Sequence, residues 1–256
     1  QVSNNLLSAL LGRFFTPGIV GQYTQSAKWN TMGYSVVSGM IGSVAQPVLT
    51  EASNDRSRQL NVLRKMLRLA AFLSFPAMLG LALVAEELIV IAITDKWLAC
   101  VPILQALCLW GAFMPIITLY TNLIISKGRS NIYMWNTIAL SLTQMATLIL
   151  SHSYGLQIMV ICFVCVNIGW LLVWQYFAEQ AVGLTLWMTA KDILPFAFIA
   201  LCTTLTAWYV TLGIENVYLR FVCKVAIGAA GYIVVMWLSH ARIFKECVGF
   251  ILKRKL

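Results

Sequence analysis

LQIMVICFVCVNIGWLLVWQY, the stretch from Leu156 to Tyr176, contains no charged side chain. An α-helix needs about 20 apolar residues to cross the hydrocarbon core of a bilayer, which is about 30 Å thick. Inside that core each backbone N–H and C=O must be satisfied within the structure, and a helix achieves this within one segment. The stretch therefore predicts a helix that spans a membrane.

The composition extends this prediction to the whole chain. Hydrophobic residues make up 60% of the 256 residues and charged residues 11%, whereas soluble domains carry about 25% charged residues. So few charges do not cover the surface of a water-soluble fold of this size, and so apolar a chain is not disordered. We predict an all-α fold, a polytopic helical bundle in a membrane.

Seven further apolar stretches bring the expected number of transmembrane segments to about eight. In chain order the eight run from Val2 to Phe15, Val20 to Leu49, Met66 to Val84, Val101 to Ile125, Ile132 to Leu150, Leu156 to Tyr176, Ile193 to Leu212 and Val222 to Leu238. Every connection between them is short, so we expect a single membrane domain. Because the chain begins with Gln1 and not Met, we expect it to be the C-terminal part of something longer.

Lys and Arg, which give the net charge of +9, lie mostly in the connections. If the segments alternate in direction, one side receives thirteen of them: Arg56, Arg58, Arg64, Lys65, Arg68, Lys127, Arg129, Lys191, Arg242, Lys245, Lys253, Arg254 and Lys255. The other side receives four: Arg13, Lys96, Arg220 and Lys224. Basic residues favour the cytoplasmic side, so we predict a cytoplasmic C-terminus. Charges placed in this way argue against a nucleic-acid partner.

No group of residues has the pattern of a catalytic or metal site. Cys162 and Cys165 form a CxxC within a span, but no second Cys or His pair follows to complete a zinc site. Glu86 and Glu87 are adjacent, so on a helix they point about 100° apart and do not share a substrate. We therefore expect no enzyme activity, metal or cofactor. The stretch 85–100 is too short to span, and we expect an interfacial amphipathic helix there, with Trp97 at the headgroups.

The second segment is the candidate substrate-binding element. It carries Gln22, Gln25, Lys28 and Asn30 within or beside a span, where hydrocarbon penalises polar groups unless they face a wet cavity or a partner helix. One interpretation is that Lys28 extends its amine to the headgroups. The other is that Lys28 faces a polar cavity and binds an anionic group such as a phosphate. Asn5 adds an amide to the first segment, which interhelical hydrogen bonding also explains.

Two other features concern packing and bending. Ser35, Gly39 and Ser43 are spaced so that another helix backbone can approach closely, and Gly228 to Gly231 form a similar cluster. Pro76 and Pro115 fall inside spans, where a proline removes a backbone hydrogen bond and favours a kink. Such kinks permit bending during alternating access, and they also occur as static features.

Several short motifs, taken in order, resemble a known family. They are Leu10-Leu11-Gly12-Arg13-Phe14-Phe15, Val20-Gly21-Gln22-Tyr23, Gln25-Ser26-Ala27-Lys28-Trp29, Gln46-Pro47-Val48-Leu49, Asp95-Lys96-Trp97 with Pro102-Ile103-Leu104-Gln105, and Ser126-Lys127-Gly128-Arg129-Ser130. This ordered set resembles the C-terminal half of bacterial polysaccharide flippases, the lipopolysaccharide and O-antigen exporters of the multidrug/oligosaccharidyl-lipid/polysaccharide superfamily. The resemblance covers essentially the whole chain.

The resemblance implies a fourteen-helix transporter in the bacterial cytoplasmic membrane, of which this chain forms helices seven to fourteen. Residues 1–176 would be lobe helices, and 177–256 two additional helices with a basic cytoplasmic tail. The implied substrate is an undecaprenyl-pyrophosphate-linked oligosaccharide, flipped by alternating access. Lys28, Gln25 and Asn5 are the residues carried over, although many relatives place an Asp where Asn5 stands. Implied partners are membrane lipids, the missing N-terminal lobe and other polysaccharide-assembly proteins.

Three alternatives stay open at this point. A cation-coupled multidrug exporter of the same superfamily would need acidic residues inside the membrane, and the sequence suggests none. An integral membrane enzyme of envelope polysaccharide synthesis would need a His or carboxylate in a large loop near the membrane, and the loops are short. A membrane scaffold for a biosynthetic complex is a purely structural alternative.

Overall fold

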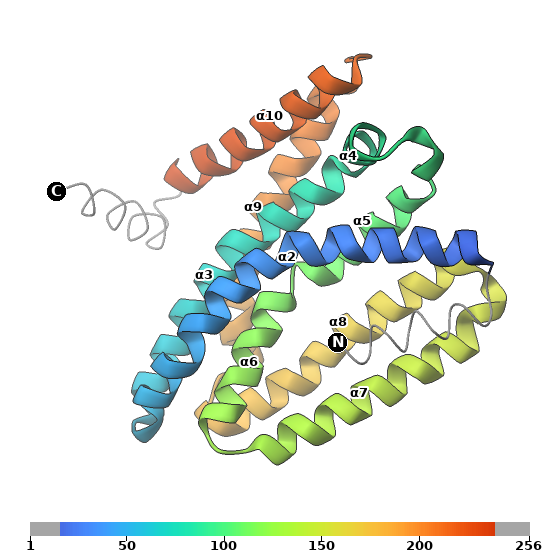
Figure 1. Cartoon of the computed structure of the whole chain (residues 1–256). Coiled ribbons are helices and arrows are strands. Elements are labelled where there is room, and N and C mark those ends of the chain that lie inside the picture. Colours follow the sequence, from blue (N-terminus) through green and yellow to red (C-terminus); the bar gives the residue numbers. More distant parts are fainter. Residues whose placement is uncertain (1–15, 239–256) are drawn as a thin grey trace.

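The computed structural model describes residues 16–238, and in this range the chain forms α-helices, short 3₁₀ turns and no strand (Figure 1). The predicted all-α membrane bundle is therefore confirmed. The first predicted segment, which includes Asn5, and the basic tail beyond residue 238 lie outside the described residues.

Each of the seven predicted segments within the described range corresponds to helix. The helices are α2 (Pro17–Glu51), α3 (Arg56–Leu83), α4 (Ala85–Ala92), α5 (Cys100–Gly111), α6 (Met114–Ser126), α7 (Ser130–Ser151), α8 (Leu156–Val182), α9 (Leu186–Val210) and α10 (Val217–Leu238). Short 3₁₀ turns η1 (Ala52–Asn54), η2 (Asp95–Trp97) and η3 (His152–Tyr154) lie in the connections. The segment predicted from Val101 to Ile125 is broken into two helices, α5 and α6.

Several helices begin before the apolar run that predicted them. Helix α3 begins at Arg56, ten residues before the predicted Met66, because Asp55 caps it by accepting hydrogen bonds from the N–H groups of Ser57 and Arg58. Helix α9 begins at Leu186, where Thr185 is the capping residue. Hydropathy marks the part of a helix that matches hydrocarbon, whereas capping groups determine where the backbone hydrogen bonding starts.

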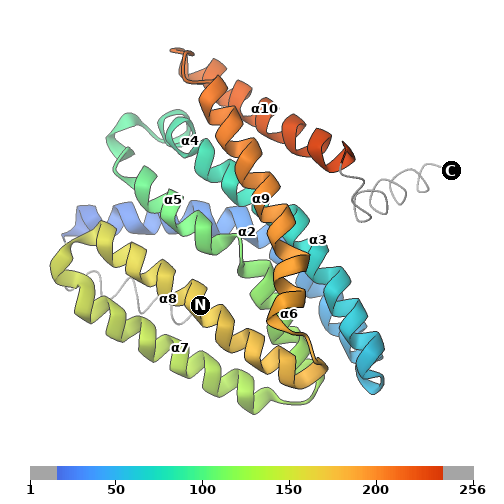
Figure 2. The ribbon, with the colours of Figure 1, turned by 180° about the vertical axis from the view of Figure 1, so that it is seen from behind.

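Five helical stretches in the described range are long and apolar enough to cross a membrane. They are α3, the α5–α6 pair, α8, α9 and α10. Helices α2 and α7 are not among them, although they lie in the same bundle (Figures 1 and 2). Amide and hydroxyl side chains occur along the length of both helices.

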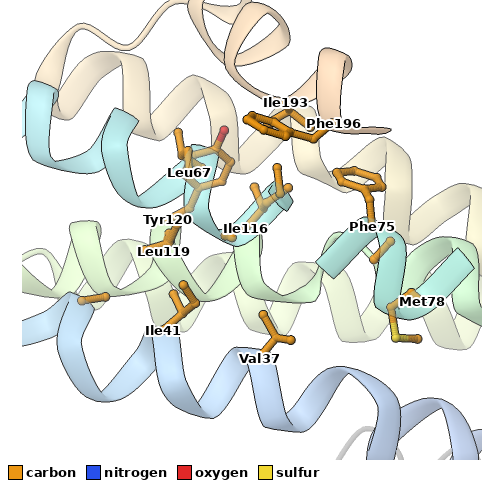
Figure 3. Close-up of a cluster of buried hydrophobic side chains, with 14 of the residues drawn as sticks. Val37, Ile41, Leu67, Phe75, Met78, Ile116, Leu119, Tyr120, Ile193 and Phe196 are labelled. Atoms are coloured by element: carbon orange, nitrogen blue, oxygen red, sulfur yellow. The ribbon is translucent and has the colours of Figure 1, made fainter. Parts of the chain in front are cut away.

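The main core lies on both sides of α3 (Figure 3). One side of α3 packs against α2 and α6, and the other side packs against α9. Small side chains at Ala70, Ala71 and Ala200 are fully buried, which allows these helices to approach closely. Close approach matters in a membrane because lipid is as apolar as the core, so packing rather than water exclusion holds the helices together.

Helix α2 bends, and the α5–α6 break lies beside it (Figures 1 and 2). The first part of α2 packs on α5 and the second part on α6 and α3. At the break, a Cβ built on Gly111 would lie 2.4 Å from Asn30 Oδ1 and 2.5 Å from Met78 Cε. The Ser74 hydroxyl of α3 donates to the Ala112 carbonyl, which the break leaves without a helical partner. Helices α2, α3 and α5 therefore pack closely together at the α5–α6 break.

The basic connections meet at one end of the bundle. Lys127 Nζ, after α6, donates to the Ser53 carbonyl, which follows α2, at 2.9 Å. Gly183, which ends α8 with a φ of +82°, lies against the Arg56 guanidinium at the start of α3. The three connections that were predicted to share one side therefore lie together. That this side is cytoplasmic remains a prediction.

The stretch 85–100 contains the expected short helix, α4. Glu86 is exposed, but Glu87 is 0% exposed. Lys224 of α10 covers this carboxylate and is itself buried. Helix α4 therefore packs against α10, and its place at the membrane surface, with Trp97 at the headgroups, stays a prediction.

Candidate functional site

The predicted polar side of α2 is present and faces away from the core. Lys28 is exposed, and Gln22 and Gln25 are half-buried. Further along the same helix, exposed apolar and small residues alternate. We call these residues together the open face of α2: Gln22, Gln25, Lys28, Met32, Ser35, Val36, Gly39, Met40, Ser43 and Val44.

The opposite side of α2 is anchored to its neighbours, which sets the direction of the open face. Ser26 is fully buried, and its hydroxyl lies 3.0 Å from the Cys100 carbonyl of α5 and 2.9 Å from the Gln22 carbonyl. Tyr23 packs into a second core formed with α5, α7 and α8. The Trp97 ring lies beside Gly21, within ordinary contact distance of the position that a Cβ would take. These contacts prevent α2 from rotating its polar side inward.

Asn30 does not belong to the open face. It is 2% exposed and lies against Gly111 at the α5–α6 break. Two residues correspond to about 200° around a helix, so Asn30 and Lys28 project to nearly opposite sides. The structure therefore does not bring Asn30 together with Lys28, and a role of Asn30 in substrate binding stays a prediction, because the spacing of polar residues does not say which of them another helix covers.

Lys28 makes no ion pair with any residue between 16 and 238. It lies eleven residues from the start of α2, which is about 16 Å along the axis. Its exposed ammonium can extend to the headgroups, lie in an aqueous space or bind an anion. Gln22 and Gln25 add amide groups that donate and accept hydrogen bonds.

The two clusters of small residues behave differently. Gly228 and Gly231 of α10 pack against Ala207 and Thr203 of α9, as predicted. In contrast, Ser35, Gly39 and Ser43 lie on the open face, and a Cβ on Gly39 would meet no atom within 4 Å. Within the described residues this stripe of α2 therefore packs against no other helix.

The two prolines that were expected to kink helices occupy different settings. Pro76 lies inside α3. Pro115 lies in the first turn of α6, where a proline fits well because the first helical N–H groups have no partner. It therefore follows the α5–α6 break rather than standing inside a continuous helix.

Sequence reasoning missed two buried ionic groups. Glu87 lies 2.7 Å from Lys224 Nζ and 2.5 Å from Arg220 Nε. Asp192, which is 4% exposed inside α9, accepts from Arg64 at 2.7 and 3.1 Å. Asp192 is thus a buried carboxylate within a helix that is long and apolar enough to span a membrane, and the apolar runs did not reveal it. Charge pairing across more than a hundred residues leaves no local sequence signal.

The open face of α2 presents groups that can bind a polar or anionic ligand. No group of three or more His, Cys, Asp or Glu side chains that could hold a metal ion occurs in the part of the chain that the structure describes. Both buried carboxylates are paired with cations, so neither is a free acid of the kind that a cation-coupled exporter would use. What the open face presents is a cation, amides and small side chains.

Comparison with known proteins gives consistent results. Residues 1–102 match the model of a family described as polysaccharide biosynthesis protein. An uncharacterised membrane protein in the cps region of Klebsiella pneumoniae is 24% identical over 97% of this chain and 52% of its own length. The teichuronic acid biosynthesis protein TuaB of Bacillus subtilis is 22% identical over 92% of this chain and 50% of its own. WzxC, a lipopolysaccharide biosynthesis protein of Escherichia coli, is 24% identical over 51% of this chain and 27% of its own.

Among solved structures, the lipid II flippase MurJ in an inward closed conformation has the same fold. The TM-score is 0.75 at 19% identity, with 90% of this chain and 49% of that chain covered. The chain thus spans about half the length of the Klebsiella protein, of TuaB and of MurJ. The resemblance drawn from the sequence is confirmed: this multi-pass membrane chain is similar in sequence to polysaccharide biosynthesis membrane proteins and has the fold of about half of MurJ.

Proposed function

We propose that this chain forms one half of a bacterial flippase that moves undecaprenyl-pyrophosphate-linked oligosaccharide across the cytoplasmic membrane for lipopolysaccharide or polysaccharide synthesis. The observation that carries the proposal is the open face of α2, where an exposed Lys28 lies about 16 Å along a helix of a membrane bundle. The similarity to polysaccharide biosynthesis proteins supports the same class of substrate.

The proposed substrate matches the chemistry of this face. A pyrophosphate carries several negative charges, and a lysine ammonium binds phosphate oxygens as a compact point charge. Gln22 and Gln25 can donate to phosphate oxygens and can both donate to and accept from sugar hydroxyls. Asn5, which lies outside the described residues, is carried over from the resemblance alone. An ammonium placed in this way also lowers the penalty for moving the charged head group past hydrocarbon.

The open face needs an opposite wall to form a cavity. The relatives are about twice as long as this chain, so we assign the opposite wall to the missing N-terminal lobe. The stripe of Ser35, Gly39 and Ser43 would allow that lobe to approach α2 closely. Rocking of the two lobes about this contact would open the Lys28 region to each side in turn, which is alternating access. The chain alone is then not expected to transport.

The test is complementation of a flippase-deficient strain by the full-length protein, with surface polysaccharide as the readout. Lys28→Ala should lower transport about tenfold or more, because a hydrogen bond to a charged group contributes about 1.5–3 kcal/mol. Lys28→Arg should keep much of the activity, since it retains the charge. Lys96→Ala removes an exposed cation of η2 and serves as the matched control. Undiminished polysaccharide in Lys28→Ala, at wild-type protein levels, would remove Lys28 from the mechanism.

A further inference from the structure

The outer face of α9 carries an apolar groove of about 680 Å³ that the proposed transport function does not use. Its walls include Trp187, Lys191, Leu194, Pro195, Phe198 and Leu201. These residues recur at three- and four-residue steps, so they project from one side of the helix. The opposite side, with Phe196 and Ala200, is buried against the core.

The groove has the length of one membrane leaflet. Lys191 and Leu201 are ten residues apart, which corresponds to about 15 Å along the helix. This is half the thickness of a hydrocarbon core of about 30 Å. A groove of this length fits an alkyl chain that runs from a headgroup beside Lys191 to about the middle of a bilayer.

One end of the groove has the residues of a headgroup region. Trp187 is 78% exposed, and exposed Trp side chains are enriched where lipid headgroups meet the acyl chains. Lys191 is exposed and forms no ion pair with residues 16–238. This end of α9 also lies beside the basic N-terminal half of α3, since Asp192 contacts Arg64 and Arg68.

The neighbouring carboxylate does not neutralise Lys191. Asp192 is 4% exposed and accepts both of its hydrogen bonds from Arg64, at 2.7 and 3.1 Å. Arg68 lies 3.7 Å from the same carboxylate. One carboxylate therefore faces two guanidinium groups, and the charge left at this end of the groove is positive.

We propose that this groove binds an anionic membrane phospholipid, with one acyl chain along Leu194, Phe198 and Leu201 and the phosphate at Lys191. The apolar walls accommodate the chain, and the ammonium attracts the headgroup. A zwitterionic lipid carries its own ammonium near the phosphate, so it gains less from Lys191. The site therefore selects for headgroup charge rather than for the acyl chain.

The experiment uses the intact protein in detergent and counts bound lipids by native mass spectrometry. Phosphatidylglycerol and phosphatidylcholine with identical acyl chains are titrated separately. The wild type should retain phosphatidylglycerol better than phosphatidylcholine. Lys191→Gln should lower its affinity about fivefold, since one Lys near an anionic headgroup contributes about 1 kcal/mol, and should leave phosphatidylcholine unchanged. Lys191→Arg should bind as the wild type does.

Two variants separate this site from general effects. Lys96→Gln removes an exposed charge from η2, away from the groove, and should change neither affinity. Phe198→Ala should weaken both lipids alike, because it shortens the apolar wall. The proposal is overturned if Lys191→Gln leaves the preference for phosphatidylglycerol intact, or if Lys96→Gln reduces it as much, since net charge alone would then explain the binding.

Discussion

Removing the Glu87 carboxylate should destabilise the protein far more than its place in a short peripheral helix suggests. Glu87 is 0% exposed and Lys224 is 7% exposed at the side chain, with the carboxylate oxygen and ammonium nitrogen 2.7 Å apart. Lys224 also donates to the Leu83 carbonyl at 3.1 Å. Glu87→Gln would leave this buried ammonium without its countercharge.

Breaking a buried ion pair by removing one partner costs about 3–5 kcal/mol. Arg220 lies 2.5 Å from the same Glu87 oxygen and also pairs with Glu86, so it keeps one anionic partner after the substitution. The loss should therefore come mainly from Lys224, and we expect a decrease of about 3 kcal/mol in the free energy of unfolding. The double variant Glu87→Gln with Lys224→Met should lose less than the sum of the two single variants, because it removes both charges of the pair and leaves no buried ammonium without its partner.

Unfolding by a denaturing detergent in mixed micelles measures these differences. The matched control is Glu51→Gln, which breaks the pair with Arg58 at 3.1 Å, where the side chains are 73% and 61% exposed. Exposed pairs contribute about 0–1 kcal/mol, so this control should be close to the wild type. If Glu87→Gln and Glu51→Gln cost the same, or if the double variant is fully additive, the buried pairing does not hold α10 to α4.

Three further predictions concern packing, hydrogen bonding and pH. Gly111→Ala should cost about 1–3 kcal/mol by overpacking against Asn30 and Met78, whereas Gly39→Ala, which has open space, should be near neutral in the same unfolding assay. Tyr120→Phe should cost about 0.5–1.5 kcal/mol, because it removes the 2.6 Å bond to Gln175 Oε1, which still accepts from Thr189; a neutral result would contradict this. The N–H of Arg58 and the Ser57 side chain and N–H hold the pKa of Asp55, in the α2–α3 connection, below its usual 3.8. The Asp55 carboxylate therefore stabilises the fold above its unfolded pKa, and this stabilisation is lost as the pH falls through the lower folded pKa. Asp55→Asn should flatten the loss of thermal stability below about pH 4. An unchanged pH profile in this variant would argue against a role of Asp55.

Much of the fold followed from local sequence properties. Hydropathy predicted seven helical segments within the described range, and each of them is present. The placement of Lys and Arg predicted which connections share an end, and the Lys127 contact with Ser53 shows that two of them meet. These properties are readable because lipid acts on each segment separately, whatever its neighbours are.

The candidate site was only partly predictable. The position of Lys28 on a polar side of α2 was apparent from the residue types, since an unpaired charge in a span is unusual in any context. The separation of Asn30 from Lys28 was not apparent. It required knowledge that α2 packs on the α5–α6 break at Gly111, and residue spacing within α2 says nothing about its neighbours.

The amino-acid sequence alone therefore determined which stretches are helical, how apolar they are and where the basic connections lie, because each depends on a residue and its immediate neighbours. Only the tertiary structure decided which polar groups face open space and which face a partner. Glu87 and Lys224 are both buried, and the sequence did not predict this. Their partnership depends on helices 137 residues apart in the chain coming within hydrogen-bond distance, and that juxtaposition is a property of the whole bundle.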